Sequence, residues 1–186
     1  MVDFSFLSPV QDRLVDQIKL LHGQAIGKKL RIHCTSTQPE LEGVKIAIVG
    51  VLESRNSLDY IGEEFQLNEI RKAFYGLFPG NWSLDMADLG DIQKGATVED
   101  TYFALSQLVS GLVQANIIPL ILGGSQDLTY ANYRAYDKIS SMVNVVNIDK
   151  SFDLGDSSKP INNGSYLGKI ILEQPYNLFN YTAIGF

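Results

Sequence analysis

The fold of this chain is decided by residues 117–156, which read IIPLILGGSQDLTYANYRAYDKISSMVNVVNIDKSFDLGD. Residues 117–122 and 143–148 are short apolar runs rich in β-branched side chains, and Gly123 and Gly124 break the first run. We expect two buried strands joined by a helix, because strands that alternate with helices form βαβ units. Sites in such sheets lie beyond the carboxyl ends of the strands. We therefore expect the chemistry of this protein around three polar residues: Gln126, Asp149 and Asp153.

The regions on both sides of this stretch continue the alternation. We expect further strands over residues 45–52, 82–86 and 181–186, and helices over residues 9–21, 64–77, 97–113 and 165–172. This order predicts an α/β fold, a three-layer α/β/α sandwich around a mostly parallel sheet. We expect one domain over residues 1–186, in which 1–44 form an N-terminal helix and an irregular lead-in and 45–186 form the core. Because the chain stops inside an apolar run, a carboxyl-terminal portion is expected to be missing.

Three of the expected helices carry local signals. Ser8 and Pro9 are typical of an N-cap followed by proline at the first helical position. Thr97 opens a helix whose first turn carries acidic residues, as the helix dipole favours. The helix over residues 64–77 has apolar residues at helical spacing that we expect to face the core: Leu67, Ile70, Phe74 and Leu77.

Composition excludes several classes of function. The net charge is −6 and the pI is about 4.8, whereas nucleic acids and anionic membranes are bound by basic surfaces. No apolar run approaches the roughly 20 residues that span a bilayer, and no signal peptide is evident at the N-terminus. The single cysteine, Cys34, cannot form an internal disulfide. We therefore expect a cytoplasmic protein with no nucleic-acid or membrane partner.

The glycine pair is a weak signal for a ligand. The sequence contains neither G-x-G-x-x-G nor G-x-x-x-x-G-K-[ST], so no nucleotide-binding loop is indicated. Gly123 and Gly124 precede a helix whose N-terminal N–H groups could bind an anion. The alternative is a plain strand-to-helix turn that requires a positive φ.

The carboxylates after residues 143–148 are more suggestive. Asp149 and Asp153 stand four residues apart just past the end of a strand and could point at one hard cation, with Asp156 nearby. The alternative is that they cap the turn by accepting backbone N–H groups, as aspartates do in loops.

Two motifs at this position resemble those of a known family. The runs P-L-I-L-G-G-S-Q-D and V-V-N-I-D-K-S-F-D-L resemble the G-G-x-H and D-A-H-x-D motifs of the ureohydrolases (arginase, agmatinase and formimidoylglutamase), with formimidoylglutamase the most similar. Residues 45–57 resemble the first strand and loop of that family, N-E-I-R at 68–71 resembles its G-P-x-x-I-R helix, and D-L-G-D at 88–91 resembles its D-x-G-D strand end. The resemblance covers roughly residues 45–186 and implies an arginase-like fold.

The departures from the family pattern concern its metal ligands. The resemblance implies a pair of Mn²⁺ ions held by both histidines and both aspartates of these motifs and by a later D-x-D, which would lie beyond residue 186. In this chain the two histidines are replaced by Gln126 and Ser151, and only Asp149 and Asp153 keep ligand chemistry. Lys150 replaces the alanine and either turns inward, as a cation among the carboxylates, or outward into solvent. The later proton-shuttling histidine is also absent, because no histidine follows residue 33.

These losses predict a protein that keeps the fold without the chemistry. Imidazole binds Mn²⁺-class ions much better than an amide oxygen or a hydroxyl does, and the hydroxide that attacks the guanidinium carbon in this family forms because two cations lower the pKa of water. We expect no dinuclear centre, no cofactor and no catalysis, with any metal held weakly by Asp149 and Asp153. A small-molecule ligand would meet a set of cleft candidates: Gln126, Asp127, Lys150, Ser151, Asp156, Asn163 and Ser165. The alternative is an active, manganese-dependent hydrolase of C–N bonds in linear amidines with an atypical site. Oligomers are common in the family, so the resemblance also implies a homo-oligomer.

Overall fold

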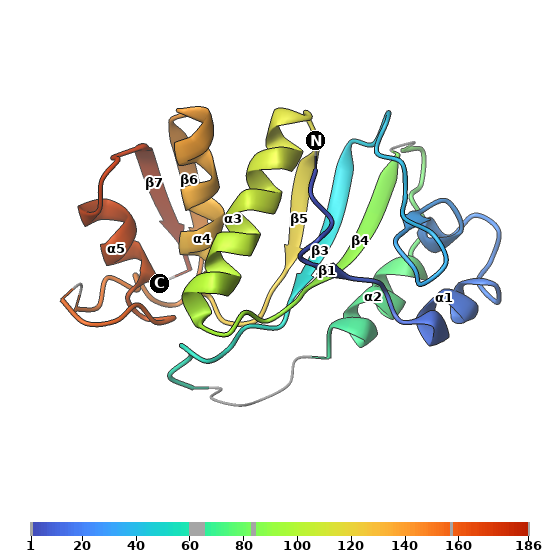
Figure 1. Ribbon diagram of the computed structural model, residues 1–186, viewed down its shortest axis with the longest axis horizontal. Coiled ribbons are helices and arrows are strands. Elements are labelled where there is room, and N and C mark those ends of the chain that lie inside the picture. The colour runs from blue at the N-terminus through green and yellow to red at the C-terminus, as the bar shows by residue number, and fades with distance from the viewer. Residues whose placement is uncertain (1, 60–65, 83–84, 157, 186) are drawn as a thin grey trace. The chain divides into compact units, whose positions relative to one another are not determined.

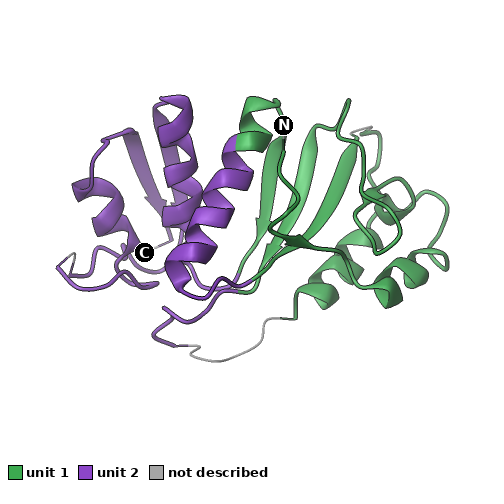
Figure 2. Ribbon diagram, in the orientation of Figure 1, with its two compact units in different colours: residues 1–52, 64–93, 111–123 green, residues 53–63, 94–110, 124–186 purple. Residues whose placement is uncertain are grey.

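The structure is a computed structural model that describes residues 2–59, 66–82, 85–156 and 158–185. The chain divides into two compact units (Figure 2). Unit 1 comprises residues 1–52, 64–93 and 111–123, and unit 2 comprises residues 53–63, 94–110 and 124–186. Helices alternate with mainly parallel strands along the chain (Figure 1), which confirms the α/β class.

Unit 1 is built on a five-stranded sheet. Its strands are β1 (Leu7–Ser8), β2 (Arg31–Ile32), β3 (Ile46–Val51), β4 (Met86–Ile92) and β5 (Ile118–Leu122). Strand β3 lies between β4 and β5 and is parallel to both, β2 adds to β4 in parallel, and β1 pairs with β4 antiparallel. The expected strands over residues 45–52 and 117–122 are confirmed to within one residue at each end.

The N-terminal helix of unit 1 is shorter than its sequence pattern predicts. Helix α1 spans Asp12–Ile18, so the expected start at Ser8 and Pro9 is wrong. Ser8 belongs to β1 instead, where its hydroxyl donates to the backbone oxygen of Asp91 at 3.1 Å. The short helix η1 (Ile26–Lys28) follows. The apolar spacing still identifies the buried face of this region, because Val10, Leu14 and Ile18 form a buried cluster with Tyr75 of a later helix.

Helix α2 (Leu67–Tyr75) buries only part of the face that the apolar spacing predicts, because Leu67 is buried and Phe74 packs against a buried cluster. Residues 64 and 65 of the expected helix lie outside the described residues. Ile70 and Leu77 are half-exposed, whereas Arg71 and Tyr75 are fully buried. Arg71 forms a forked ion pair with buried Asp88, Nε–Oδ2 2.8 Å and NH2–Oδ1 3.2 Å, and Tyr75 donates to the same carboxylate at 2.7 Å. A charged residue can face the core here because its partner is buried with it.

The same ion pair explains why the second expected strand is misplaced. The prediction of a strand over residues 82–86 is wrong: β4 begins at Met86 and contains the whole D-L-G-D run, while residues 83 and 84 lie outside the described residues. Two aspartates would not be expected inside a buried strand, but Arg71 forms an ion pair with each, and its NH1 lies 2.7 Å from Asp91. Gly90 has a φ of +85° and leaves no room for a Cβ beside the backbone of Ser8.

Unit 2 contains the remaining elements. They are α3 (Val98–Gln114), whose residues 111–114 are assigned to unit 1, α4 (Leu128–Arg134), η2 (Ala135–Ile139), β6 (Val143–Ile148), α5 (Tyr166–Leu172) and β7 (Leu178–Ile184). Strands β6 and β7 form a parallel two-stranded sheet. A cluster of Tyr133, Tyr166, Leu167 and Ile170 packs one face of that sheet.

The boundaries in unit 2 agree well with the sequence. The expected strand over residues 143–148 and the helix over 165–172 are confirmed, and β7 extends the strand expected over 181–186 toward its N-terminus. Thr97 caps α3 as predicted, because its Oγ1 accepts from the Asp100 N–H at 3.2 Å while the Asp100 carboxylate accepts from the Thr97 N–H at 2.8 Å.

Candidate functional site

The glycine turn before α4 is set by a close backbone approach. A Cβ on Gly124 would overlap the carbonyl oxygen of Glu53, and the next residue, Ser125, donates its N–H to that oxygen at 2.9 Å. The φ of Gly124 is not in the left-handed region, so the expected reason for the glycine, a positive φ, is wrong. Helix α4 has only seven residues, and its N-cap residue is the carboxylate Asp127, so the anion-binding alternative stays a prediction.

Glu53 is the buried centre of the loop that follows β3. Its side chain is fully buried, and Arg55 donates to it through Nε at 2.9 Å and NH2 at 2.6 Å. Thr101 donates its hydroxyl at 2.9 Å, and the backbone N–H groups of Ser54 and Arg55 also point at the carboxylate. Burial by itself would raise the pKa of Glu53, but these hydrogen bonds and the Arg55 charge outweigh it and hold the pKa at about 2.

Asp127 is a second buried carboxylate, directly after Gln126. It accepts hydrogen bonds from the hydroxyls of Tyr102 and Ser125, and Asn56 donates to Tyr102 at 3.2 Å. Burial raises the pKa of Asp127 in spite of these donors. These hydrogen bonds tie α3 to the turn that carries Gln126, and the role of Asp127 as a ligand-cleft residue stays a prediction.

Gln126 lies against the carboxylate that follows β6. Its Nε2 donates to Asp149 Oδ2 at 2.5 Å and to the buried Tyr166 hydroxyl at 3.3 Å. The Lys150 backbone N–H donates to the other Asp149 oxygen at 2.6 Å. The hydrogen bond from Gln126 holds the pKa of Asp149 below its usual range. The structure therefore brings together Gln126 and Asp149, as the sequence predicts, and adds Tyr166, which sequence reasoning missed.

Asp153 completes this group of side chains. Ser151 donates to its Oδ1 at 2.7 Å, while its Oδ2 is shielded from solvent without a hydrogen-bond donor. Burial, reinforced by the charge of Asp149, raises the pKa of Asp153. The backbone of Asp153 has a φ of +50°, which turns the chain back so that its carbonyl accepts from the Leu167 N–H at 3.2 Å. Of these two neighbouring carboxylates, Asp149 is thus favoured in its charged form and Asp153 in its neutral form.

The other predicted cleft residues have different surroundings. The Lys150 side chain is exposed, which favours the outward alternative. Asp156 is exposed and accepts from Ser158 in its own turn. Asn163 links two loops, accepting from the Leu58 N–H at 2.9 Å and donating to Asp59 at 3.2 Å. Buried Ser165 accepts from the backbone N–H of a neighbouring loop residue. Their role as ligand-cleft residues stays a prediction.

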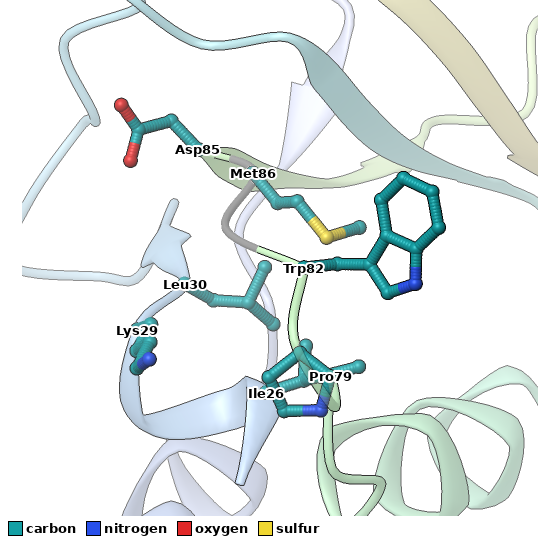
Figure 3. Close-up of a pocket in the computed structure, with 7 residues that line it drawn as sticks. All are labelled: Ile26, Lys29, Leu30, Pro79, Trp82, Asp85 and Met86. Atoms are coloured by element: carbon teal, nitrogen blue, oxygen red, sulfur yellow. The ribbon is translucent and has the colours of Figure 1, made fainter. Parts of the chain in front are cut away.

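A concave site of another kind lies in unit 1 (Figure 3). Its volume is about 200 Å³, and its lining includes Leu30, Trp82 and Met86, with Lys29 and Asp85 as its charged residues. It contains none of the predicted site residues. Within the described part of the chain, no helix combines the length and apolar composition needed to cross a bilayer.

Comparison with known families matches residues 44–186 to the arginase family. The chain belongs to the arginase family. It is 29% identical over 128 residues to a formimidoylglutamase of Staphylococcus epidermidis, covering 67% of this chain and 40% of that protein. It is 28% identical over 130 residues to the human mitochondrial guanidino acid hydrolase, covering 65% and 37%. The chain thus spans about 40% of the length of these curated relatives.

Solved structures show the same fold. Formimidoylglutamase from Bacillus subtilis superposes with a TM-score of 0.62 at 23% identity, covering 72% of this chain and 44% of that one. Formiminoglutamase from Trypanosoma cruzi, solved with Mn²⁺, superposes with a TM-score of 0.62 at 21% identity, covering 74% and 51%. The expected arginase-like fold, with formimidoylglutamases among the relatives, is therefore confirmed.

The donors at the candidate site do not suit a pair of manganese ions. Asp149 and Asp153 are carboxylates, but the positions where the resemblance implies imidazoles hold Gln126 and Ser151, and both of these hydrogen-bond to the carboxylates. No cluster of three or more histidine, cysteine, aspartate or glutamate side chains suited to a metal forms among the described residues. The site offers hydrogen-bonding groups in place of a strong ligand set.

Proposed function

We propose that this chain is a non-catalytic member of the arginase family that has lost the dinuclear manganese centre. The observation that carries the proposal is the hydrogen bond between Gln126 and Asp149. Gln126 stands at the motif position where the resemblance implies a metal-binding histidine. Its amide N–H group points at the Asp149 carboxylate, whereas a metal ligand would have to present a lone pair there. An N–H group cannot coordinate a cation.

The second replaced histidine supports the same proposal. Ser151 donates to Asp153, so that carboxylate is also engaged by a protein donor. A hydroxyl is a weak ligand for Mn²⁺, and the exposed Lys150 adds a positive charge to the same loop. The remaining assignments, one domain over residues 1–186, a cytoplasmic location and a homo-oligomer, stay predictions.

Metal analysis tests the proposal directly. The protein is purified from medium supplemented with Mn²⁺, its metal content is measured by mass spectrometry, and its melting temperature is followed during a Mn²⁺ titration. We expect substoichiometric manganese and no saturable rise in melting temperature. A stoichiometric pair of tightly bound manganese ions would contradict the proposal.

Activity assays address the alternative of an atypical hydrolase. Urea release from arginine and agmatine, and formamide release from formimidoylglutamate, are measured with and without Mn²⁺. We expect rates equal to those of the buffer. Release that depends on Mn²⁺ and disappears in Asp149→Asn would instead establish a manganese-dependent hydrolase of linear amidines.

A further inference from the structure

The concave site of unit 1 has apolar walls and an uncovered indole ring. Its apolar lining residues are Ile26, Leu30, Pro79, Trp82 and Met86. The Met86 side chain extends toward the Trp82 ring (Figure 3), and Trp82 is 77% exposed. An indole ring that stands beside other apolar side chains at a concave surface offers a ligand a face on which an aromatic ring can stack.

Backbone hydrogen bonds hold two walls of the site in place. Ile26 of η1 donates its N–H to the Leu77 carbonyl at 2.8 Å, which fixes η1 against the segment that follows α2. The Trp82 N–H donates to the Pro79 carbonyl at 3.2 Å, in the turn that presents the indole ring. These walls are therefore preformed, and a ligand would lose little affinity to ordering of the protein.

The positive charge at this site comes from the densest basic stretch of the sequence. Residues 28–31 read K-K-L-R and hold three of the 15 lysines and arginines. Lys28 donates its Nζ to the Lys19 carbonyl at 2.8 Å, and Arg31 donates through NH1 to two backbone carbonyls at 3.0 and 2.7 Å. Lys29 lines the concave site, and its ammonium has no hydrogen-bond or ion-pair partner among the described residues.

The carboxylate of Asp85 does not cancel the Lys29 charge. Asp85 Oδ2 lies 3.9 Å from Arg31 NH2, so this carboxylate already has a cation beside it. Figure 3 shows the Asp85 carboxylate directed away from the Trp82 ring. The described lining thus presents an unpaired ammonium next to an apolar surface, which is complementary to a molecule that joins an aromatic ring to a carboxylate.

The volume of the site sets the size of its ligand. Pockets for drug-sized molecules measure about 300–1,000 Å³, whereas this site measures about 200 Å³. An apolar cavity of about 150 Å³ is large enough for a benzene molecule, so a single ring with a short acidic arm fits here.

We propose that this site binds a small aromatic monocarboxylate, with its ring against Trp82 and Met86 and its carboxylate at Lys29. The Met86 thioether suits this ring because sulfur makes favourable contacts with aromatic groups. The site shares no residue with the group around Gln126 and Asp149. The proposal is therefore independent of whether that group binds manganese.

The fluorescence of Trp82 provides a direct test, because the sequence contains one tryptophan. Phenylacetate is titrated into the millimolar range, and uncharged phenylacetamide is the matched probe. We expect a saturable blue shift of the emission, because the indole ring leaves water when the ligand covers it. The Kd for phenylacetate should be at least about threefold lower than the Kd for phenylacetamide. The 2-phenylethylammonium ion, which reverses the charge, should bind no more tightly than phenylacetamide.

Two lysine variants test the position of the charge. Lys29→Met should raise the Kd for phenylacetate at least about threefold and leave the Kd for phenylacetamide unchanged. Lys28→Met removes the same charge one residue away and outside the lining, so it is the matched control and should leave both Kd values unchanged. Both side chains are exposed, so each variant should keep its melting temperature within about 2 °C.

A second pair of variants tests the aromatic contact by calorimetric titration, which does not depend on the indole fluorescence. Trp82→Leu should weaken phenylacetate binding about three- to tenfold. Phe78→Leu is the control, because Phe78 is an exposed aromatic residue outside the lining, and it should bind phenylacetate like the unmodified chain.

Several results would overturn the proposal. They are the absence of a saturable response to phenylacetate, equal Kd values for phenylacetate and phenylacetamide, tighter binding of 2-phenylethylammonium, and equal losses in Lys28→Met and Lys29→Met. A dimer that Trp82→Leu dissociates would overturn it as well, because a second copy of the chain would then cover the site.

Discussion

Replacing Arg71 with methionine should destabilise the protein more than any single surface change. The guanidinium and Asp88 are both fully buried, and five hydrogen bonds hold Arg71 to Asp88, Asp91 and Gly90 and Tyr75 to Asp88. Methionine fills much of the same volume but leaves the Asp88 charge without its cation. Breaking a buried pair from one side costs about 3–5 kcal/mol.

The expected loss is measurable by urea unfolding followed by far-UV circular dichroism. A loss of 3–5 kcal/mol corresponds to a fall in melting temperature of roughly 10 °C for a chain of this size. Lys72→Met is the matched control, because Lys72 is the next residue of α2 and its side chain is 56% exposed; its effect should stay within about 0.5 kcal/mol.

A double variant separates the ion pair from simple packing. Combining Arg71→Met with Asp88→Asn removes the stranded charge, so the double variant should be more stable than the sum of the single losses predicts. The reasoning is refuted if Arg71→Met costs less than about 1 kcal/mol, or if the two losses simply add.

Three further predictions concern unit 2. Introducing histidine at both Gln126 and Ser151 should create Mn²⁺ affinity, and Mn²⁺ at 100 times the resulting Kd would stabilise the variant by about 2.7 kcal/mol. A melting temperature that does not change when Mn²⁺ is added would contradict the assignment of these positions as metal-ligand positions. Because the pKa of Glu53 is about 2, below its usual 4.5, its contribution is present above pH 4.5 and is lost as the pH falls toward 2; it amounts to about 3 kcal/mol at most. Urea unfolding between pH 6 and pH 2.5 should therefore show a shallower loss for Glu53→Gln, and equal slopes would refute this role. Gly124→Ala should cost about 1–3 kcal/mol because its methyl group would overlap the Glu53 carbonyl oxygen; Gly23→Ala, with no atom within 4 Å of its Cβ, is the control, and similar losses for both would argue against the overlap.

Local patterns were sufficient where local physics decides the structure. The apolar run at residues 143–148 predicts both ends of β6, and Thr97 with Asp100 predicts the start of α3, because strand propensity and capping act over a few residues. The two aspartates after β6 and Gln126 before α4 were predicted to meet, since strand ends converge at one edge, and Gln126 does contact Asp149.

Long-range partners explain each failure. Apolar periodicity assigned Ile70 to the core face of α2, but the buried face is the one that carries Arg71, because Asp88, seventeen residues later, neutralises it. The same pair allows an aspartate inside β4, so the expected strand was placed too early. No local pattern contains the information that two opposite charges will be buried together.

The sequence by itself determined the strand-and-helix order, the arginase-family motifs, and the glutamine and serine at the positions where the resemblance implies histidines, because these depend only on residue identity and short spacing. Only the tertiary structure decided what the replacements do. It shows the Gln126 amide on Asp149, the Ser151 hydroxyl on Asp153 and Tyr166 beside them, because residues distant in the chain must come within hydrogen-bonding distance before a side chain acquires a partner.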